Sequence, residues 1–301
     1  MLKRLLYIFI AIFVILIAIS EGFIRFALKP ALQDEPVSEW EDSVMHCGAL
    51  RDTFLVSNDS GDSIHAWYLR ADSATNKVAV LVHGYCNDGL MMGKFAEIFD
   101  RHLHYNIVLP NLHYHGKSKG DYIQMGWRDR LDVMQWCEFA NRMFDCDGSG
   151  TMQVLHGVSM GAATIMCVSG ETLPPYIRCF IEDCGYTSVW DEFENELDNQ
   201  FSLPPFPILY TTSWLNKLQN GWSFTEASAL SQVAKCKRPM LFIHGGDDSY
   251  VKTEMVYRLY DAKPSPKQLQ VFPKSKHAMS YDDNREHYTQ LVKSFVNRYN
   301  R

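Results

Sequence analysis

The chain has 301 residues, of which 47% are hydrophobic and 21% are charged, and its formal net charge is −6. This composition is typical of a globular protein and excludes a disordered tail, a collagen-like fibre and a polytopic membrane protein. No segment concentrates basic residues, so nucleic acid is not expected as a partner. The chain has 8 cysteines, too few for a disulfide scaffold, and those inside apolar runs are expected to be free thiols.

The N-terminal segment differs from the rest of the chain because Leu5 to Ile19 is an unbroken apolar and aromatic run. As a helix this run spans about 22 Å, and Phe23 and Ile24 extend it toward the roughly 30 Å hydrocarbon core of a bilayer. The run is apolar on every side, which is not expected of a helix that is half-buried in a protein core. We therefore expect residues 1–24 to form an N-terminal segment that contacts the membrane through residues 5–24.

Two interpretations of this segment are open. Ala18-Ile19-Ser20 resembles a small-x-small cleavage site, so a secretory signal peptide would also fit, and the protein would then be secreted. We favour an uncleaved anchor. Lys3 and Arg4 bias the N-terminus toward the cytoplasm, which would place the catalytic part outside the cytoplasmic membrane.

Residues 25–50 are expected to be a linker and lead-in, interrupted by Pro30 and Pro36. Beyond them, apolar runs of strand length alternate with segments of helical periodicity. The expected strands cover residues 52–57, 63–70, 78–82, 106–110, 151–155, 177–182, 240–243 and 268–272. The expected helices cover residues 91–102, 128–144, 162–169, 253–260 and 285–299. This alternation predicts a mostly parallel α/β sheet within one domain over residues 51–301.

A nucleophile elbow is predicted at Gly157-Val158-Ser159-Met160-Gly161, between an expected strand and an expected helix. The serine of such a turn sits in a strained backbone conformation, and Gly157 and Gly161 are needed because side chains there would clash. The turn exposes the Ser159 hydroxyl above the sheet. We therefore expect Ser159 to be the nucleophile.

A serine nucleophile needs a base, and the base needs an acid that orients it. His277 follows the last expected strand and is the predicted base. The preceding strand ends in a glycine turn that carries two aspartates, Asp247 and Asp248. The spacing H-G-x-x-D-x-x-V selects Asp248 as the acid, whereas Asp247 is expected to be a turn or cap residue.

The oxyanion of an acyl-transfer reaction needs two backbone donors. One is expected from the N–H of Met160. The other should come from the loop Val82-His83-Gly84-Tyr85-Cys86-Asn87, where the N–H of Tyr85 is the predicted donor. His83, His156 and His244 all precede or follow strand ends and are expected to be structural.

The chain resembles α/β-hydrolases of the bacterial esterase and serine-aminopeptidase-like group, some of which carry an N-terminal membrane anchor. The resemblance covers roughly residues 50–300. It rests on His83-Gly84-Tyr85, His115-Gly116-Lys117-Ser118, the Ser159 elbow, Ile243 to Asp248, and His277-Ala278-Met279-Ser280-Tyr281. It implies the α/β-hydrolase fold, in which helices flank a mostly parallel central sheet and a helical cap is inserted.

One stretch departs from the family pattern D-x-R-G-x-G-x-S. Here it runs from Asn111 to Ser118, and the arginine and first glycine are replaced by His113 and Tyr114. The hydrogen bonds that brace this loop in the family are therefore not expected in the same form. The predicted triad does not depend on them.

The resemblance also implies a cap over residues 186–236, a segment far longer than an ordinary connection. Most of its aromatic residues are expected to pack the cap onto the sheet, and a few to line an apolar acyl pocket. These residues are Trp190, Phe193, Phe201, Phe206, Trp214, Trp222 and Phe224. The acidic run from Glu192 to Asp198 is expected to be a solvated helix face, although Glu192 or Glu194 would suit a substrate amine.

We find no dinucleotide fingerprint and no histidine, cysteine and carboxylate set at metal-ligand spacing, so no cofactor and no metal is expected. The sequence predicts a serine hydrolase that cleaves an ester of a small, largely apolar acyl substrate through an acyl-enzyme. A serine aminopeptidase-like amidase is the alternative enzyme. A non-catalytic ligand-binding protein on the same fold is the alternative from another class.

Overall fold

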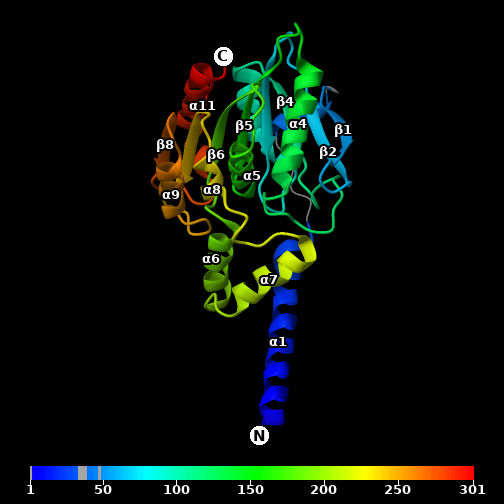
Figure 1. The fold of residues 1–301 in the computed structure, drawn as a ribbon. Helices are drawn as coiled ribbons and strands as arrows, with labels where there is room; N and C mark the ends of the chain where they lie inside the picture. Colours follow the sequence, from blue (N-terminus) through cyan, green and yellow to red (C-terminus); the bar gives the residue numbers. More distant parts are fainter. Residues whose placement is uncertain (1, 33–38, 47–48) are drawn as a thin grey trace.

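The computed structural model describes residues 2–32, 39–46 and 49–301. Eight strands form one sheet: β1 (Arg51–Val56), β2 (Ser63–Leu69), β3 (Lys77–Val82), β4 (Asn106–Pro110), β5 (Met152–Val158), β6 (Ile177–Asp183), β7 (Met240–Gly245) and β8 (Lys267–Phe272). Their order across the sheet is β1-β2-β4-β3-β5-β6-β7-β8. β2 pairs antiparallel with both β1 and β4, and all the other pairs are parallel. The predicted, mostly parallel α/β sheet is thus confirmed (Figure 1).

Helices cover both faces of the sheet, and β3 shows why the sequence requires this. Val78, Val80 and Val82 belong to one apolar core, whereas Ala79 and Leu81 belong to the other. Successive side chains of a strand point to opposite faces, so an uninterrupted apolar run needs cover on both. The first core is covered by α4 (Asp129–Phe144), α5 (Met160–Ser169), α8 (Ala229–Val233) and α9 (Glu254–Ala262). The second is covered by α3 (Gly93–Glu97) and α11 (Arg285–Tyr299).

The expected helix over residues 91–102 is a succession of shorter turns. A 3₁₀ turn, η1 (Gly89–Met92), precedes α3, and a π-helical turn, η2 (Ile98–His102), follows it. Asp88 explains the early start, because its carboxylate accepts hydrogen bonds from the N–H groups of Leu90 and Met91. Ahead of α11, residues Ser280–Asp283 form the short helix α10.

The N-terminal helix, α1 (Leu2–Leu28), extends beyond residue 24 into the segment expected to be a linker. Ser20, Ile24 and Leu28 are buried at a spacing of one helical turn, so this end of the helix is held by tertiary packing. A further helix, α2 (Glu39–His46), follows, and Pro36 and Cys47 lie outside the described residues. α1 is long and apolar enough to cross a membrane, a property that a signal sequence shares.

The segment expected to form a cap contains α6 (Val189–Phe201), α7 (Ile208–Asn220) and α8. Figure 1 shows α6 and α7 outside the sheet, on the side of the molecule where α1 joins it, whereas α8 lies beside α5 and α9. α1 packs against α7. The N-terminal helix and the inserted helices therefore meet at one end of the molecule.

Candidate active site

Ser159 occupies the turn between β5 and α5. Its backbone has φ 55° and ψ −120°, a conformation that residues with a side chain rarely adopt. The Ser159 N–H donates to the carbonyl of Asp183 at 2.8 Å, which ties the turn to the neighbouring strand. A side chain at position 157 would collide with the backbone of Gly161, and one at position 161 would collide with the backbone of Val82. The structure thus explains why both neighbours are glycines.

The structure brings His277 and Asp248 to Ser159. His277 Nε2 lies 2.9 Å from Ser159 Oγ, and His277 Nδ1 lies 2.8 Å from Asp248 Oδ2. Asp248 follows β7 and is fixed by its other oxygen, which accepts from the N–H groups of Tyr250 and Val251, each at 3.0 Å. Asp247 is exposed. Of the two aspartates, Asp248 is therefore the one that contacts the imidazole.

Asp248 is held in its ionised form. Burial alone would raise its pKa, but the hydrogen bonds with His244 and His277 outweigh burial and hold the pKa of the carboxyl below its usual range. His244 Nε2 lies 3.3 Å from Asp248 Oδ2 and donates to the carbonyl of Val251 at 2.9 Å. His244 therefore braces the acid loop, in line with the structural role expected for it.

Cys184 lies beneath this pair, and its Sγ, a carboxylate oxygen of Asp248 and a ring nitrogen of His277 are within 4.8 Å of one another. Such a set has the composition of a metal site. However, burial raises the pKa of the Cys184 thiol well above its usual range. The other two members of the set, Asp248 and His277, are hydrogen-bonded to each other at 2.8 Å.

The loop after β3 lies against the nucleophile. A Cβ added to Gly84 would be in van der Waals contact with Ser159, and Tyr85 and Met160 both line the cavity above the serine. Met160 is the first residue of α5, where backbone N–H groups lack intrahelical partners. The two predicted oxyanion donors therefore belong to residues on the same cavity as Ser159.

Two buried histidines brace this loop. His83 donates to the carbonyl of Gly84 at 2.7 Å and accepts from the N–H of Leu112 at 3.0 Å. His115 Nε2 accepts from the N–H of Cys86 at 3.2 Å. Burial lowers the pKa of His83 to about 4 and that of His115 to about 3. Both imidazoles are therefore neutral near pH 7, so His83 has the structural role expected for it.

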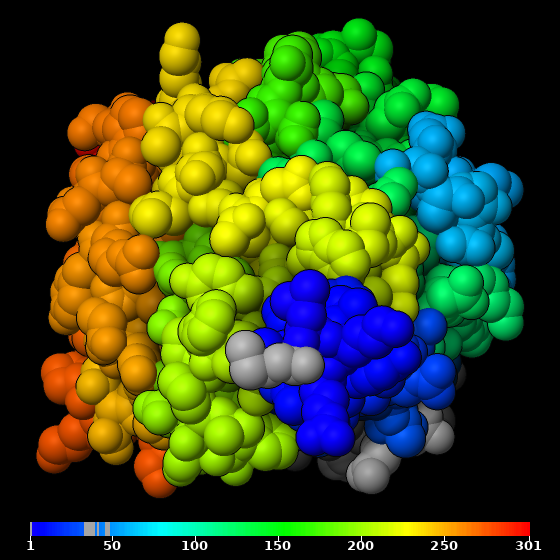
Figure 2. Space-filling view, turned by 60° about the horizontal axis from the view of Figure 1, so that its bottom comes forward, coloured from blue at the N-terminus to red at the C-terminus, as the bar shows by residue number. Residues whose placement is uncertain are grey.

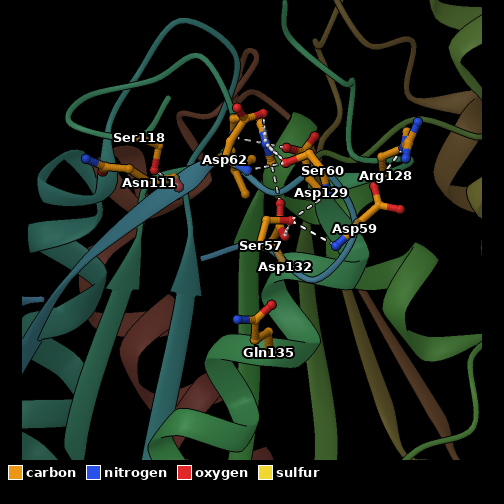
Figure 3. A network of polar contacts seen from close by, with 12 residues as sticks. Ser57, Asp59, Ser60, Asp62, Asn111, Ser118, Arg128, Asp129, Asp132 and Gln135 are labelled. Carbon is orange, nitrogen blue, oxygen red and sulfur yellow. Dashed lines mark hydrogen bonds and ion pairs between the residues drawn. The ribbon is translucent and has the colours of Figure 1, made fainter. Parts of the chain in front are cut away.

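The segment Asn111 to Ser118 is braced differently from the family pattern. Ser118 Oγ donates to the carbonyl of Asn111 and accepts from the N–H of His65. His113 Nδ1 lies 2.7 Å from Asp132 Oδ2. Figure 3 shows the surrounding network, in which the turn between β1 and β2 meets the start of α4; its members include Ser57, Asp59, Ser60, Asp62, Arg128, Asp129 and Asp132.

A cavity of about 270 Å³ opens above Ser159. Its walls come from three parts of the chain: the end of α1, the loops around the sheet, and α6. The residues that line it are Phe23, Phe26, Ala27, Pro30, Tyr85, Met125, Ser159, Met160, Tyr186, Glu192, Phe193, Glu196, Gln200, Phe201 and Tyr250. Most of these side chains are apolar or aromatic, as expected of a site for an apolar ligand.

The contribution of α1 to this cavity was not predicted from the sequence. Phe23 fell within the expected membrane segment, and Phe26 and Ala27 fell within the expected linker. In the structure Phe23 packs on Phe201 of α6 with ring centroids 5.7 Å apart, and the Tyr85 hydroxyl donates to the Ala27 carbonyl at 2.8 Å. The available signal was the continuation of apolar residues beyond Glu21 at helical spacing.

Glu192 also differs from its expectation. It was assigned to a solvated helix face, but only 3% of its surface is exposed, and it lines the cavity of Ser159. Its Oε2 is buried and has no hydrogen-bond partner within the described part of the chain. Burial, and then the negative charges of Glu196 and Asp248, raise its pKa well above the usual range. Glu194 does not line this cavity.

The seven cap aromatics differ in exposure: Trp190 is half-buried, and Phe201 is 46% exposed and lines the cavity. Phe193, Trp222 and Phe224 are buried, as expected of residues that pack inserted helices onto a core. Phe206 is 71% exposed and Trp214 is 50% exposed. Neither side chain packs onto the sheet or lines the cavity. For these two residues the expectation from sequence was wrong.

The sequence of this chain is similar to a known protein family and to two uncharacterized bacterial proteins. Residues 112–301 match the prolyl oligopeptidase family, Peptidase_S9. The chain is 27% identical over 247 residues to the uncharacterized protein YqkD of Bacillus subtilis, covering 82% of this chain and 79% of that protein. It is 24% identical over 245 residues to the uncharacterized protein YfhR of Escherichia coli K12, covering 79% of this chain and 78% of that protein.

Solved structures share the fold. The esterase Pf2001 of Pyrococcus furiosus superposes with a TM-score of 0.68 at 20% identity, covering 89% of this chain and 99% of that one. An acylaminoacyl peptidase of Pyrococcus horikoshii gives a TM-score of 0.60 at 17% identity, covering 86% of this chain and 44% of that one. At these identities the similarity establishes the α/β-hydrolase fold, as the motifs predicted.

Proposed function

The chain belongs to the prolyl oligopeptidase family of hydrolases, and from this membership we propose that it cleaves carboxylic esters through Ser159, His277 and Asp248. The observation that carries the proposal is the pair of contacts at His277: one ring nitrogen lies 2.9 Å from the Ser159 hydroxyl and the other lies 2.8 Å from the Asp248 carboxylate. A serine is activated in this way by a base that an acid holds in the right tautomer.

In the first half of the reaction, Ser159 Oγ attacks the ester carbonyl while His277 Nε2 takes the hydroxyl proton. The ionised Asp248 stabilises the imidazolium that results. The backbone N–H groups of Tyr85 and Met160 donate hydrogen bonds to the carbonyl oxygen as its negative charge develops. As the tetrahedral intermediate collapses, His277 gives its proton to the departing alcohol, and the acyl group remains on Ser159.

In the second half, water occupies the place of the alcohol. His277 takes a proton from this water as the water oxygen attacks the acyl carbonyl, and the same two N–H groups again donate hydrogen bonds to the charged carbonyl oxygen. The second intermediate expels Ser159, which recovers its proton from His277. The carboxylic acid leaves, and the net reaction adds one water across the ester bond.

The preference for an ester with an apolar acyl group rests on the walls of the cavity. Aromatic side chains from α1 and α6, namely Phe23, Phe193 and Phe201, surround the space above Ser159. We expect the full chain, purified in detergent, to hydrolyse p-nitrophenyl acyl esters with an optimum chain length that reports the depth of this space. Ser159→Ala should abolish the turnover. Equal turnover by Ser159→Ala and the wild type would exclude the proposed nucleophile.

A second candidate function is an aminopeptidase-like amidase, and Glu192 is the observation that favours it. Its buried carboxyl has an unpartnered oxygen on the cavity, and no lysine or arginine is among the described residues that line it. A substrate amine would supply the missing partner. If the enzyme is an aminopeptidase, the full chain should cleave aminoacyl amides, and Glu192→Gln should reduce that cleavage far more than it reduces cleavage of neutral esters.

We also propose that α1 stays attached as a membrane anchor. The helix is unbroken at Ala18-Ile19-Ser20, and Ser20 Oγ lies 2.7 Å from Thr211 Oγ1 of α7. Cleavage after Ser20 would remove this contact and leave the wall residues Phe23, Phe26 and Ala27 on a short helical remnant. Mass spectrometry of the mature protein tests this, because an intact N-terminus supports the anchor and a new N-terminus near residue 21 contradicts it.

A further inference from the structure

A row of large apolar side chains lies exposed along α7. Phe206 just precedes the helix, and Tyr210, Trp214 and Leu218 follow at intervals of four residues. Their exposed fractions are 71%, 55%, 50% and 63%, respectively. Residues four apart lie on the same side of a helix. We call these four residues the α7 stripe, and water would contact half or more of the surface of each side chain if nothing covered it.

The opposite side of α7 is fully used by the protein. Its buried residues are Leu209, Thr212, Ser213, Leu215 and Asn216. Asn216 donates to the carbonyl of Trp222, and the Ser213 hydroxyl accepts from the N–H of Phe224. The helix is therefore anchored to the body by one side while the stripe points away from it. Among the stripe residues, Tyr210 packs its ring on Trp190 of α6, with centroids 4.8 Å apart, and on Phe206, with centroids 5.8 Å apart, yet each stripe residue remains at least half exposed.

The stripe lies next to the place where α1 leaves the body. Thr211 of α7 contacts Ser20, and the side chain of Gln219 donates to Glu21 at 2.8 Å. From this point toward the N-terminus, α1 is apolar and its first fourteen described residues are all exposed. Figure 2 shows α1 end on, with α6 and α7 around it on the same face of the molecule. The exposed surfaces of α1 and α7 are thus neighbours on one face.

We propose that the α7 stripe lies on the surface of a lipid bilayer that α1 enters, so that the cavity of Ser159 takes its ester substrate from the lipid phase. The proposal rests on the anchoring of α1 put forward above. The occupant is a bilayer because the stripe is continuous with a helix of membrane-spanning length. A helix that lies flat on a bilayer buries its apolar side among the headgroups and acyl chains.

The side chains at this junction fit the chemistry of a membrane surface. Tyr210 and Trp214 are of the aromatic types that gather where hydrocarbon meets water. Lys29 is exposed near the end of α1, and so is Arg25, whose Nε donates to Glu21 at 2.8 Å; both side chains can reach lipid phosphates from there. A second copy of this chain would not require basic residues at this position. An apolar protein partner would cover the stripe but leave the apolar surface of α1 exposed to water.

The cavity of Ser159 reaches the same face. Phe26 and Phe201 both line the cavity and are 56% and 46% exposed, and their ring centroids are 5.8 Å apart. Leu203, beyond the end of α6, adds a further exposed apolar side chain at 40%. Exposed apolar side chains therefore occur both on the α7 stripe and at the cavity wall, on two helices that follow each other in the chain. The substrate class that this arrangement fits is an ester with a long acyl chain that is dissolved in the bilayer.

The proposal is tested with the full chain reconstituted in phosphatidylcholine vesicles. Phe206→Gln, Trp214→Gln and Leu218→Gln are combined in one variant, and none of these residues lines the cavity. The matched control combines Phe54→Gln, Val56→Gln and Tyr257→Gln, which are similarly exposed at 51%, 65% and 48% but belong to β1 and α9. Each protein is assayed on a long-chain ester in the bilayer and on soluble p-nitrophenyl acetate.

We expect the stripe variant to lose about tenfold or more of its kcat/KM on the bilayer ester and to stay within about twofold of the wild type on the soluble ester. The control variant should match the wild type on both. An unchanged rate of the stripe variant on the bilayer ester would overturn the proposal, and so would an equal loss on both esters, because the stripe would then support folding.

A second measurement does not need activity. The fluorescence of Trp214 is obtained by subtracting the emission of Trp214→Phe from that of the wild type. Brominated phosphatidylcholine should quench this fluorescence, since the proposal puts the indole among the lipids. An unquenched Trp214 would mean that a protein or water covers the stripe. If the wild type hydrolyses neither ester while Trp214 is quenched, the proposed ester hydrolysis fails and the membrane contact stands.

Discussion

Two sites in this molecule place a serine, a histidine and an aspartate in the same order. At the candidate active site, His277 lies 2.9 Å from Ser159 Oγ and 2.8 Å from Asp248. In the loop network, His113 lies 2.9 Å from Ser60 Oγ and 2.7 Å from Asp132. The distances alone do not distinguish the two sites, so the difference between them must come from what surrounds each imidazole.

His113 is surrounded by carboxylates. Asp62 Oδ2 lies 3.3 Å from His113 Nε2, the ring nitrogen that also contacts Ser60. The carboxylate of Asp129 accepts a hydrogen bond from the backbone N–H of His113. Burial alone would lower the pKa of His113, but Asp132, Asp129 and Asp62 outweigh burial and raise the pKa to about 9. An imidazole that is already protonated cannot take a proton from a serine.

The serines differ as well. Ser159 has a strained backbone, begins a helix and faces a cavity. Ser60 sits in an exposed turn, does not line the cavity of Ser159, and its hydroxyl also accepts from the N–H of Asp62. A protonated imidazole cannot act as the base, and Ser60 lines no part of the cavity, so we propose Ser159 rather than Ser60 as the nucleophile.

The largest expected effect separates the two histidines. His277→Ala should lower kcat on a p-nitrophenyl ester by several orders of magnitude, about 10³-fold or more, because the serine loses its base. His113→Gln should keep the kcat of the folded fraction within about threefold of the wild type, since His113 does not contact the cavity residues that react. A modest loss for His277→Ala would remove it from the role of base.

Substitutions of Asp248 and Asp132 should also have different effects, the first on kcat and the second on the free energy of unfolding. Asp248→Asn should lower kcat on the order of 10³- to 10⁴-fold, because the imidazole loses the acid that orients it. Asp132→Asn should instead lower the free energy of unfolding by about 3 to 5 kcal/mol, since it leaves the buried charge of His113 without its nearest partner. Urea unfolding and steady-state kinetics on both variants check this. A catalytic loss for Asp132→Asn in the folded state would contradict the assignment.

The pH dependence of stability sharpens the comparison further. Because the pKa of His113 is raised from about 6.5 in an unfolded chain to about 9, its paired, protonated form stabilises the fold fully below pH 6.5. This stabilisation is lost as the pH rises through 9. The difference in free energy of unfolding between the wild type and His113→Gln should therefore shrink by roughly 3 kcal/mol between pH 6.5 and 9.5. A constant difference would show that His113 is neutral.

The smallest expected effect is that of Ser60→Ala. The hydroxyl is exposed, so its removal should change the free energy of unfolding by less than about 1 kcal/mol and leave kcat within about twofold of the wild type. Thermal unfolding and the ester assay measure both. A loss of activity comparable with that of Ser159→Ala would mean that the loop network takes part in the reaction.

The sequence predicted the sheet because each central strand is a short apolar run, and it predicted Ser159, Asp248 and His277 because their motifs have fixed spacing around strand ends. It did not predict the His113 network, whose members come from the β1–β2 turn, the loop after β4 and the start of α4. Nor did it predict the cavity wall. Phe23 and Phe26 become wall residues only because α1 packs on α7, and that contact joins segments about 190 residues apart.

The central claim is the proposal that Ser159 is the nucleophile, although Ser60 Oγ also lies 2.9 Å from a histidine, His113, whose other ring nitrogen lies 2.7 Å from Asp132. Labelling of the full chain in detergent with a fluorophosphonate probe, followed by peptide mapping, tests it most directly. We predict the label on Ser159, no label on Ser60, and no labelling of folded Ser159→Ala. A label on Ser60, or no labelling of the folded wild type, would contradict this account.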